Sequence, residues 1–250
     1  MSALLAALQL MVATPDPAAA APSVAQVIAA DAPAPPAFLN FCVTYPAECG
    51  QATSQDAQAR LSATPVLSPY WQTVFAQPSG SLTPWLRRAW VRESRELNRL
   101  EEDAIRTEAA QARVAAADQL DLLKTVNADV NARIIPRTDR EVFGDLDHWA
   151  LPLETSGAPF GDCEDFALQK RSLLRKAGLP LQVMSVAMVE TSRRETHAVL
   201  LVSTVQGVLV LDNLTSRIRR LEQTPYRIIS REMLGAPLHW KASVQPKAAG

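Results

Sequence analysis

The spacing of hydrophobic residues predicts a long helical stretch in the middle of the chain. From Thr83 to about residue 134 the sequence is rich in Ala, Arg, Glu and Leu, with no Pro or Gly after Pro84. Spacings of three and four place hydrophobic side chains of its second half on one helical face, at Leu120, Leu123, Val126, Val130 and Ile134. Thr83 followed by proline is a typical helix start, and Pro136 ends the pattern. We predict one long helix or two here.

A further helix is predicted between Gly161 and Gly178. Asp162 suits the N-cap position, acidic residues occupy the first turn, and Arg175 and Lys176 occupy the last turn, as the helix dipole favours. Gly178 stands where a residue of left-handed conformation would end the helix. We expect the buried face to consist of Phe166, Ala167, Leu173, Leu174 and Ala177.

Beyond Pro180 the pattern changes to short hydrophobic runs that are typical of strands. Strands are predicted over 181–189, 196–204 and 208–213, with a turn at Gln206-Gly207 between the last two. Three sequential antiparallel strands after a helix indicate an α+β fold.

The N-terminal part of the chain has no comparable periodicity. Residues 1–37 are rich in Ala and Pro, and we interpret them as a signal remnant and a disordered linker. Within them, Leu4–Ala13 is a short apolar run like the core of an export signal, although no Lys or Arg precedes it. Residues 38–80 are expected to form loops that pack against the main body. One domain is then predicted over 38–250, with its core at about 83–240.

Composition excludes some functions. The chain has 25 Lys and Arg residues against 26 Asp and Glu residues, a net charge of -1. This balance gives no electrostatic reason to expect nucleic acid or an acidic membrane surface as a partner. The longest apolar stretches fall well short of the roughly 20 residues that span a bilayer. We therefore expect a soluble or peripheral protein.

The cysteines carry information through their placement. Cys42 and Cys49 lie close together, and a disulfide between them would suit an oxidising compartment; two unpaired thiols are the alternative. If the disulfide forms, Cys163 is a lone free thiol, which needs a reason in an exported protein. No spacing among Cys and His residues matches a zinc site.

Cys163 stands at the start of the helix predicted over 161–178. The partial positive charge of a helix N-terminus stabilises a reactive thiolate, and free backbone N–H groups there can bind a developing oxyanion. The alternative is a small buried hydrophobic residue, the commoner role of a free cysteine. Asp162, Glu164 and Asp165 would raise the pKa of the thiol unless a metal ion or a protonated histidine offsets their charge.

His197 and Asp212 provide two further candidate groups. His197 opens one predicted strand and Asp212 closes the next, so a hairpin brings them near each other. The register stays open, because a turn at Gln206-Gly207 places His197 opposite a residue slightly beyond Asp212. Taken singly, a lone histidine on a strand is more often a core or rim residue, and an aspartate before Asn at a strand end is commonly a turn former. In the order helical Cys, strand His, strand Asp, they predict a papain-like cysteine hydrolase with nucleophile, base and orienting carboxylate.

A resemblance to the bacterial transglutaminase-like cysteine proteinases is carried by three segments, Gly161–Ala167, Thr196–Leu200 and Val210–Leu214. Segments 126–131 and 147–154 look like the same family, so the resemblance spans about residues 120–240. It implies a papain-like, transglutaminase-like fold of N-terminal helices and an antiparallel sheet, with Cys163, His197 and Asp212 as the catalytic triad.

The resemblance also implies a calcium ion near the nucleophile. The carboxylates that flank the cysteine map the calcium ligands onto Asp162 and Glu164, with Asp165 or Asp147 as further ligands, and oxygen ligands suit calcium. The best-known family members are periplasmic, cut large surface adhesins to release biofilm cells, and are restrained by an inner-membrane receptor. The resemblance therefore implies a periplasmic enzyme with a protein substrate and such a receptor as a partner. The Cys42/Cys49 segment lies outside the family's motifs and indicates a subgroup whose substrate can differ.

Two other functions compete with an endopeptidase. On the same fold, a transglutaminase or deamidase would transfer the acyl group to an amine or act on a Gln side chain, and nothing in the sequence separates these activities from peptide hydrolysis. A non-catalytic, calcium-dependent binding module is the other alternative. The complete Cys-His-Asp set argues against a pure binding module, because binding alone does not need all three groups.

Overall fold

The computed structural model of the chain describes residues 30–50, 53–63, 70–71, 74, 82–109, 119–144 and 147–243. The apolar run interpreted as an export signal lies outside these residues, as does most of the predicted linker. Within the described ranges, no helix is both long and apolar enough to cross a membrane.

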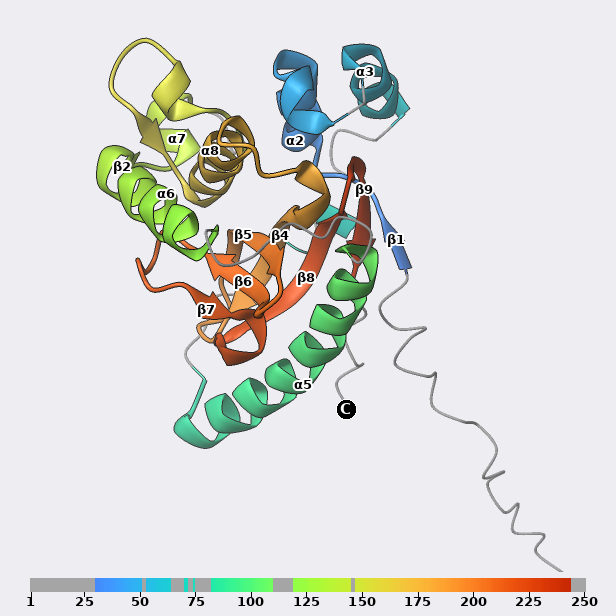
Figure 1. Ribbon diagram of the computed structural model, residues 1–250, viewed down its shortest axis with the longest axis vertical. Coiled ribbons are helices and arrows are strands. Elements are labelled where there is room, and N and C mark those ends of the chain that lie inside the picture. Colours follow the sequence, from blue (N-terminus) through green and yellow to red (C-terminus); the bar gives the residue numbers. More distant parts are fainter. Residues whose placement is uncertain are drawn as a thin grey trace, which may run out of the picture.

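A seven-stranded sheet lies at the centre of the molecule (Figure 1). All its neighbouring strands are antiparallel. Across the sheet the strands follow the order β1 (Ala30–Ala32), β9 (Ala236–Ala242), β8 (Tyr226–Met233), β4 (Met184–Thr191), β5 (Thr196–Thr204), β6 (Gly207–Leu211) and β7 (Arg219–Arg220). A separate parallel pair joins β2 (Ile135–Pro136) to β3 (Phe160–Gly161).

Helices cover both faces of the sheet. Helix α5 (Pro84–Glu108) runs along one face, and α6 (Gln119–Arg133) and α8 (Cys163–Lys176) cover the other (Figure 1). The other helices whose bounds the structure describes are α2 (Pro36–Thr44), α3 (Ser54–Ala63) and α7 (Asp139–Val142), with short 3-10 turns η1 (Pro46–Cys49), η3 (Pro152–Glu154), η4 (Leu181–Val183) and η5 (Leu221–Gln223). This arrangement confirms the predicted α+β class.

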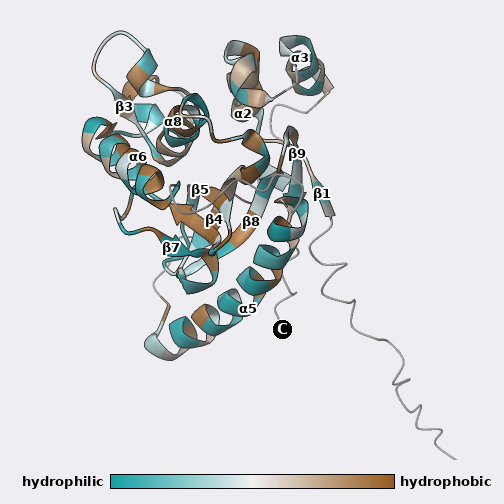
Figure 2. Ribbon diagram, viewed as in Figure 1, coloured by the Kyte–Doolittle hydropathy of each residue, from teal (hydrophilic) through white to brown (hydrophobic). Residues whose placement is uncertain are grey.

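The central strands are hydrophobic along their whole length because both faces are covered. Alternate residues of β4 and β5 enter two separate cores: Val186 and Leu200 pack with α6 and α8, whereas Val189 and Val199 pack with α5. Figure 2 shows the brown, hydrophobic strands between the helices and the mostly teal, hydrophilic surface of α5.

The two helical regions that were predicted agree with their predicted starts and ends. The stretch predicted over 83–134 forms α5 and α6, so two helices rather than one are described. Helix α8 has Asp162 at its N-cap, and Gly178 has the left-handed conformation, with φ of 97°. The buried face of α8 is wider than predicted, although Ala177, which was expected on it, is exposed. Helix α8 also buries polar residues, because Arg171 forms an ion pair with Glu232 at 2.6 Å.

The strand predictions hold for β5 and approximately for its neighbours. The strand predicted over 181–189 begins only at Met184, after the 3-10 turn η4, and β6 ends at Leu211. The turn residues are confirmed, since Thr204 pairs with Gly207. Strands β8 and β9, which lie on the opposite side of β4 from β5 and β6, were not predicted.

The loops predicted over 38–80 are wrong where the structure describes this part, because α2, η1 and α3 lie here. Helix α2 forms because it buries Phe38 and its neighbours against Trp149 and Trp240, whose rings lie 5.4 and 5.6 Å from the Phe38 ring. The end of the predicted linker differs too, since Ala30–Ala32 pair with β9. Cys42 and Cys49 form a disulfide, which leaves Cys163 as a free thiol.

Candidate active site

Cys163 is the first residue of α8, the helix that packs against β5. Its side chain is half-buried, and its sulfur accepts a hydrogen bond from the backbone N–H of Ala198. Ala198 directly follows His197, so the thiol lies beside the start of β5. The thiol donates to Glu164 Oε2 at 3.1 Å. Burial, followed by the charges of Glu164 and Asp162, raises the pKa of Cys163 well above its ordinary value.

His197 and Asp212 form a buried pair at the adjoining end of the sheet. His197 Nε2 lies 2.8 Å from Asp212 Oδ1, and both side chains are almost fully buried. Because Nε2 is engaged, Nδ1 is the ring nitrogen that can take up a proton. Burial acts to raise the pKa of Asp212, but the hydrogen bonds and charge of His197 outweigh it, so this pKa lies below its ordinary value.

A register offset that the sequence left open is bridged by the loop after β6. The ladder between β5 and β6 ends at Leu200 and Leu211, so Asp212 follows the last pair. The backbone N–H of Leu214 donates to Asp212 Oδ1 at 3.0 Å. From α6, the side-chain amide of Asn131 donates to the carbonyl oxygen of Asp212 at 2.9 Å. These bonds turn the carboxylate back toward His197.

Tyr226, the first residue of β8, is a site residue that the sequence analysis missed. Its hydroxyl donates to Asp212 Oδ2, and its ring centroid lies 5.8 Å from that of His197. Burial and the bonded Asp212 carboxylate raise the pKa of Tyr226, so the hydroxyl stays a donor. An aromatic residue at the start of a strand is common in sheets, and nothing local to Tyr226 pointed to this role.

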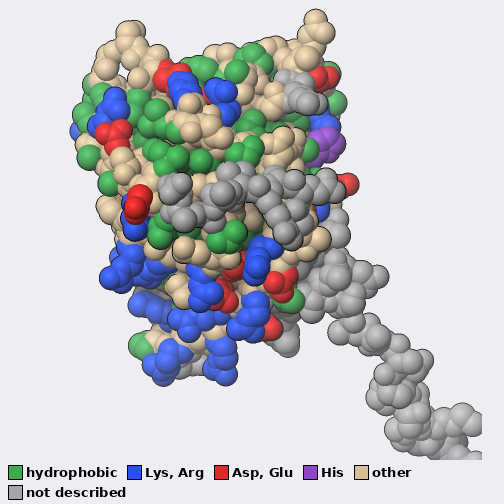
Figure 3. Space-filling view, viewed as in Figure 1, with side chains coloured by type: hydrophobic (Ala, Val, Ile, Leu, Met, Phe, Trp, Pro, Cys, Tyr) green, Lys and Arg blue, Asp and Glu red, His purple; other side chains and the backbone are tan. Residues whose placement is uncertain are grey.

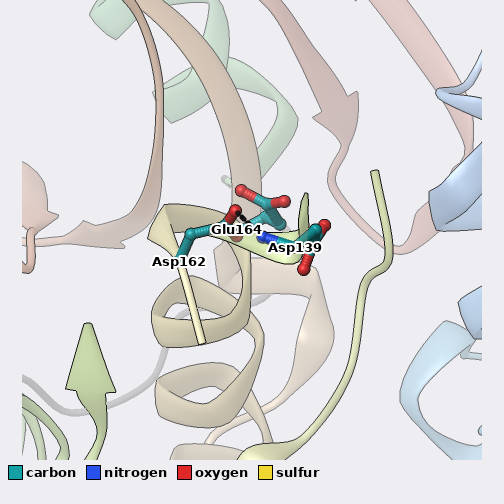
Figure 4. A group of neighbouring side chains, drawn as sticks. All are labelled: Asp139, Asp162 and Glu164. Atoms are coloured by element: carbon teal, nitrogen blue, oxygen red, sulfur yellow. Dashed lines mark hydrogen bonds between the residues drawn. The ribbon is translucent and has the colours of Figure 1, made fainter. Parts of the chain in front are cut away.

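Carboxylates surround the start of α8. One oxygen each from Asp139, Asp162 and Glu164 lies within 4.8 Å of the others (Figure 4). Asp139, at the start of α7, is the second residue that the sequence analysis missed, and its backbone N–H donates to Asp162 Oδ2 at 3.4 Å. Burial, followed by the charge of Asp162, raises the pKa of Glu164. Three oxygen donors gathered this closely have the chemistry of a calcium site.

The two other predicted metal ligands make different contacts. Asp165 accepts the backbone N–H of Ala150 at 2.7 Å and that of Asp162 at 3.3 Å, so it fastens the start of α8 to the preceding loop. Asp147 accepts the indole N–H of Trp149 at 2.7 Å. Burial raises the pKa of Asp165 to about 8 and that of Asp147 to about 7. Neither belongs to the group of three, although the charges of Asp139 and Asp162 act on both.

Comparison with known proteins adds a family to this geometry. Residues 97–248 match the family described as "Bacterial transglutaminase-like cysteine proteinase BTLCP". The matched stretch contains all three residues predicted for catalysis and the whole acidic cluster. No curated protein matches the chain.

Solved structures of LapG from Legionella pneumophila are similar to part of the chain. One is 23% identical, with a TM-score of 0.43, and covers 64% of this chain and 92% of its own. A calcium-bound structure is 20% identical, with a TM-score of 0.41, covering 64% and 91%. An EGTA-treated structure is 22% identical, with a TM-score of 0.39, covering 56% and 80%.

Proposed function

Because the chain belongs to the bacterial transglutaminase-like cysteine proteinases, we propose that it is an endopeptidase in which Cys163 is the nucleophile. His197 is the proposed general base, and Asp212 orients its ring. The observation that carries the proposal is the 2.8 Å bond between His197 Nε2 and Asp212 Oδ1, at the end of the sheet where the Ala198 N–H meets the Cys163 sulfur. A buried His–carboxylate pair beside a thiol at a helix N-terminus is the arrangement that cysteine hydrolysis requires.

The proposed reaction proceeds in two halves. Nδ1 of His197 takes the thiol proton, and the Cys163 sulfur bonds to the carbonyl carbon of the substrate peptide. The C–N bond then breaks, and the imidazolium gives its proton to the leaving amine, which leaves an acyl group on the sulfur. In the second half, His197 takes a proton from water, the resulting hydroxide attacks the thioester carbon, and the C–S bond breaks. The thiolate regains the proton from the imidazolium, and a carboxylic acid is released.

Calcium is the proposed cofactor. Asp139, Asp162 and Glu164 would hold the ion. Asp147 lies close enough that, besides burial, the charges of Asp139 and Asp162 raise its pKa. These side chains fit a hard divalent cation because they offer only oxygen atoms and because burial makes their uncompensated charge costly. Besides burial, the carboxylates beside Cys163 raise the pKa of its thiol, which opposes formation of the thiolate. A bound calcium ion would offset their negative charge.

The proposed location is the periplasm, and the proposed substrate is a surface protein such as a large adhesin. The Cys42–Cys49 disulfide supports an oxidising compartment. The adhesin and an inner-membrane regulatory receptor rest on the family resemblance alone.

The test is the rate at which iodoacetamide alkylates Cys163 at pH 6 in the presence of calcium, followed by mass spectrometry. We expect rapid alkylation in the wild type and at least about tenfold slower alkylation in His197→Ala, because the imidazolium stabilises the thiolate. His239→Ala, which changes the exposed histidine of β9, is the matched control and should react like the wild type. Equal rates in all three proteins would refute the assignment. Adding an amine acceptor to a cleavage assay then separates hydrolysis from transglutaminase activity.

A further inference from the structure

A groove lined by cations lies beside the loop that follows Asp212. Its volume is about 800 Å³, and its lining comes from the start of α6, the β5–β6 turn and the segment that contains β7. Among the residues that the structure describes, the groove is lined by Lys124, Arg217, Arg219 and Arg220 together with Leu120, Leu209 and Ile218, and by no Asp or Glu. Figure 3 shows Lys and Arg side chains gathered over the lower half of this face, around β7 and α5. The chain as a whole has a net charge of -1, so these cations form a local positive patch.

Two of the four cations lack an ionic partner among the described residues. Lys124 lies 3.0 Å from Asp121, and Arg220 lies 2.9 Å from Glu222. Arg217 and Arg219 form no ion pair with any residue that the structure describes. Like-charged neighbours without acidic partners repel one another, so a bound anion would relieve the repulsion between them.

The groove shares two lining residues with a smaller cavity beside Asp212. Arg217 and Arg219 also line a smaller cavity of about 160 Å³, whose wall includes Asp212 and Tyr226. The loop from Asp212 to β7 is held by α6, since the Asn127 side-chain amide donates to the carbonyl oxygen of Ser216 at 3.3 Å. Arg217 and Arg219 therefore line both the groove and the cavity beside Asp212.

We propose that the groove binds an acidic segment of the protein substrate, next to the segment that is cut. The inference rests on the proposed function, since it assumes that a polypeptide lies in the site. A recess with apolar residues at its base and cations around it fits an extended peptide with Asp or Glu side chains. A lipid surface would contact only the rim of such a recess. Arg217 and Arg219 are thus specificity-determining residues that recognise carboxylates several positions from the scissile bond.

The experiment measures binding without catalysis. A fluorescein-labelled octapeptide of alternating Asp and Glu is titrated with the Cys163→Ser variant in calcium, and fluorescence anisotropy gives its Kd. We expect Arg217→Gln/Arg219→Gln in the same background to bind about tenfold more weakly, since two charge pairs are lost. The matched control, Arg87→Gln/Arg88→Gln, removes two exposed arginines from α5 outside the groove and should change Kd less than about twofold. An octapeptide of Asn and Gln should not bind.

Three results would overturn the proposal. Equal weakening by both double variants would mean that general charge, not the groove, attracts the peptide. Arginine-dependent binding to phosphatidylglycerol vesicles without peptide binding would assign the groove to a membrane. Unchanged affinity with self-association of Arg217→Gln/Arg219→Gln in gel filtration would mean that these arginines only protect the edge strand β7. The binding experiment uses Cys163→Ser and does not depend on catalysis, so a failure to bind the acidic peptide leaves the peptidase proposal standing. Conversely, slow alkylation of Cys163 would refute the peptidase proposal and leave the binding result intact.

Discussion

The Tyr226 hydroxyl donates a hydrogen bond to Oδ2 of Asp212, while Oδ1 of the same carboxylate accepts one from His197 Nε2 at 2.8 Å. Both oxygens of Asp212 are therefore held, one by a residue from the neighbouring strand β5 and one from β8. This fixes the plane of the carboxylate and, through it, the orientation of the imidazole. It also means that Tyr226 influences the ionisation of a carboxylate 14 residues away in the sequence.

The Tyr226→Phe variant should be less resistant to acid. Burial acts to raise the pKa of Asp212, and the bonds from His197 and Tyr226 bring it below the ordinary value. A depressed carboxylate pKa stabilises the fold above the unfolded pKa of about 3.9, and this stability is lost as pH falls through the folded value. The free energy of unfolding of the variant should be lower by about 1–3 kcal/mol at neutral pH. On acidification, followed by circular dichroism, its unfolding midpoint should lie at a higher pH than that of the wild type.

Tyr70→Phe is the matched control for this experiment. The Tyr70 hydroxyl donates to the neutral carbonyl oxygen of Ile229 at 3.3 Å, so its removal should leave the acid midpoint nearly unchanged. A shift of the same size in both variants would show that loss of a buried hydroxyl, not the ionisation of Asp212, is responsible. For comparison, Asp212→Asn should lower peptidase activity by at least about 100-fold, because the histidine loses its orienting charge.

Local signals in the sequence were sufficient for α8 and for the β5–β6 hairpin. The N-cap at Asp162, the glycine after the helix and the turn before Gly207 each depend on a few adjacent residues, and each appears as predicted. Strand β8 could not be recognised in this way. It buries Arg227, Arg231 and Glu232, which in sequence look like exposed positions. These buried charges form ion pairs with residues distant in sequence, such as Arg231 with Glu101 on α5. The strand could therefore not be predicted from its local sequence.

The site shows the same limit. Cys163, Asp162 and Glu164 lie next to each other in sequence, so their proximity could be predicted. Asp139 joins them from 23 residues away because β2 pairs with β3, and the Arg137 N–H donates to the Gly161 carbonyl oxygen at 3.0 Å. A pairing of two residues on each side has no periodicity that a sequence pattern can reveal.

Calcium should stabilise the protein through the acidic cluster. At a concentration about 100 times its Kd, the ion should add about 2.7 kcal/mol, which corresponds to a rise in Tm of roughly 5–10 °C. Asp139→Asn should abolish this rise while leaving the calcium-free protein at least as stable, because one of three crowded charges is removed. Asp129→Asn, which changes an exposed carboxylate on α6, should respond like the wild type. A calcium response that persists in Asp139→Asn would contradict the site.

Reduction of the Cys42–Cys49 disulfide should destabilise the fold by about 2–3 kcal/mol, the value expected for a loop this short. The loop carries Glu48, which accepts hydrogen bonds from Ser172 at 3.0 Å and Arg175 at 2.6 Å, so its loosening removes support from α8. Urea unfolding with and without dithiothreitol measures the loss. Cys42→Ser/Cys49→Ser should show the same loss and no response to the reductant; a response there would come from another group.

Gly207→Ala should be more destabilising than Gly157→Ala. The two glycines have nearly the same positive φ, 116° and 114°, so the backbone strain of about 1–2 kcal/mol is common to both. A Cβ at Gly207 would lie 2.4 Å from Glu102 Oε1, whereas one at Gly157 has open space around it. Displacing Glu102 also weakens its bond with the Val208 N–H, which adds about 1–3 kcal/mol. Urea unfolding of both variants isolates this second contribution, and equal losses would refute it.

Lys170→Met should make the protein more stable at neutral and acidic pH. Lys170 is fully buried on α8, and its Nζ has no hydrogen-bond partner among the described residues. Burial lowers its pKa to about 7, although the charge of Asp212 acts in the opposite direction. Holding an ammonium group there is costly, and replacing it with an apolar side chain of similar length should gain roughly 1–3 kcal/mol at pH 6.

The pH dependence distinguishes this effect from a simple packing gain. Between the folded pKa of Lys170, about 7, and its unfolded value of about 10.4, the unfolded chain holds more protons, so wild-type stability should rise with pH. The advantage of Lys170→Met over the wild type should therefore shrink between pH 6 and pH 9 in urea unfolding. Lys241→Met provides the control, because Lys241 lies 2.9 Å from Glu108 and its loss should be destabilising at both pH values. A Lys170→Met protein that is less stable than the wild type at pH 6 would mean that the buried ammonium has a compensating partner.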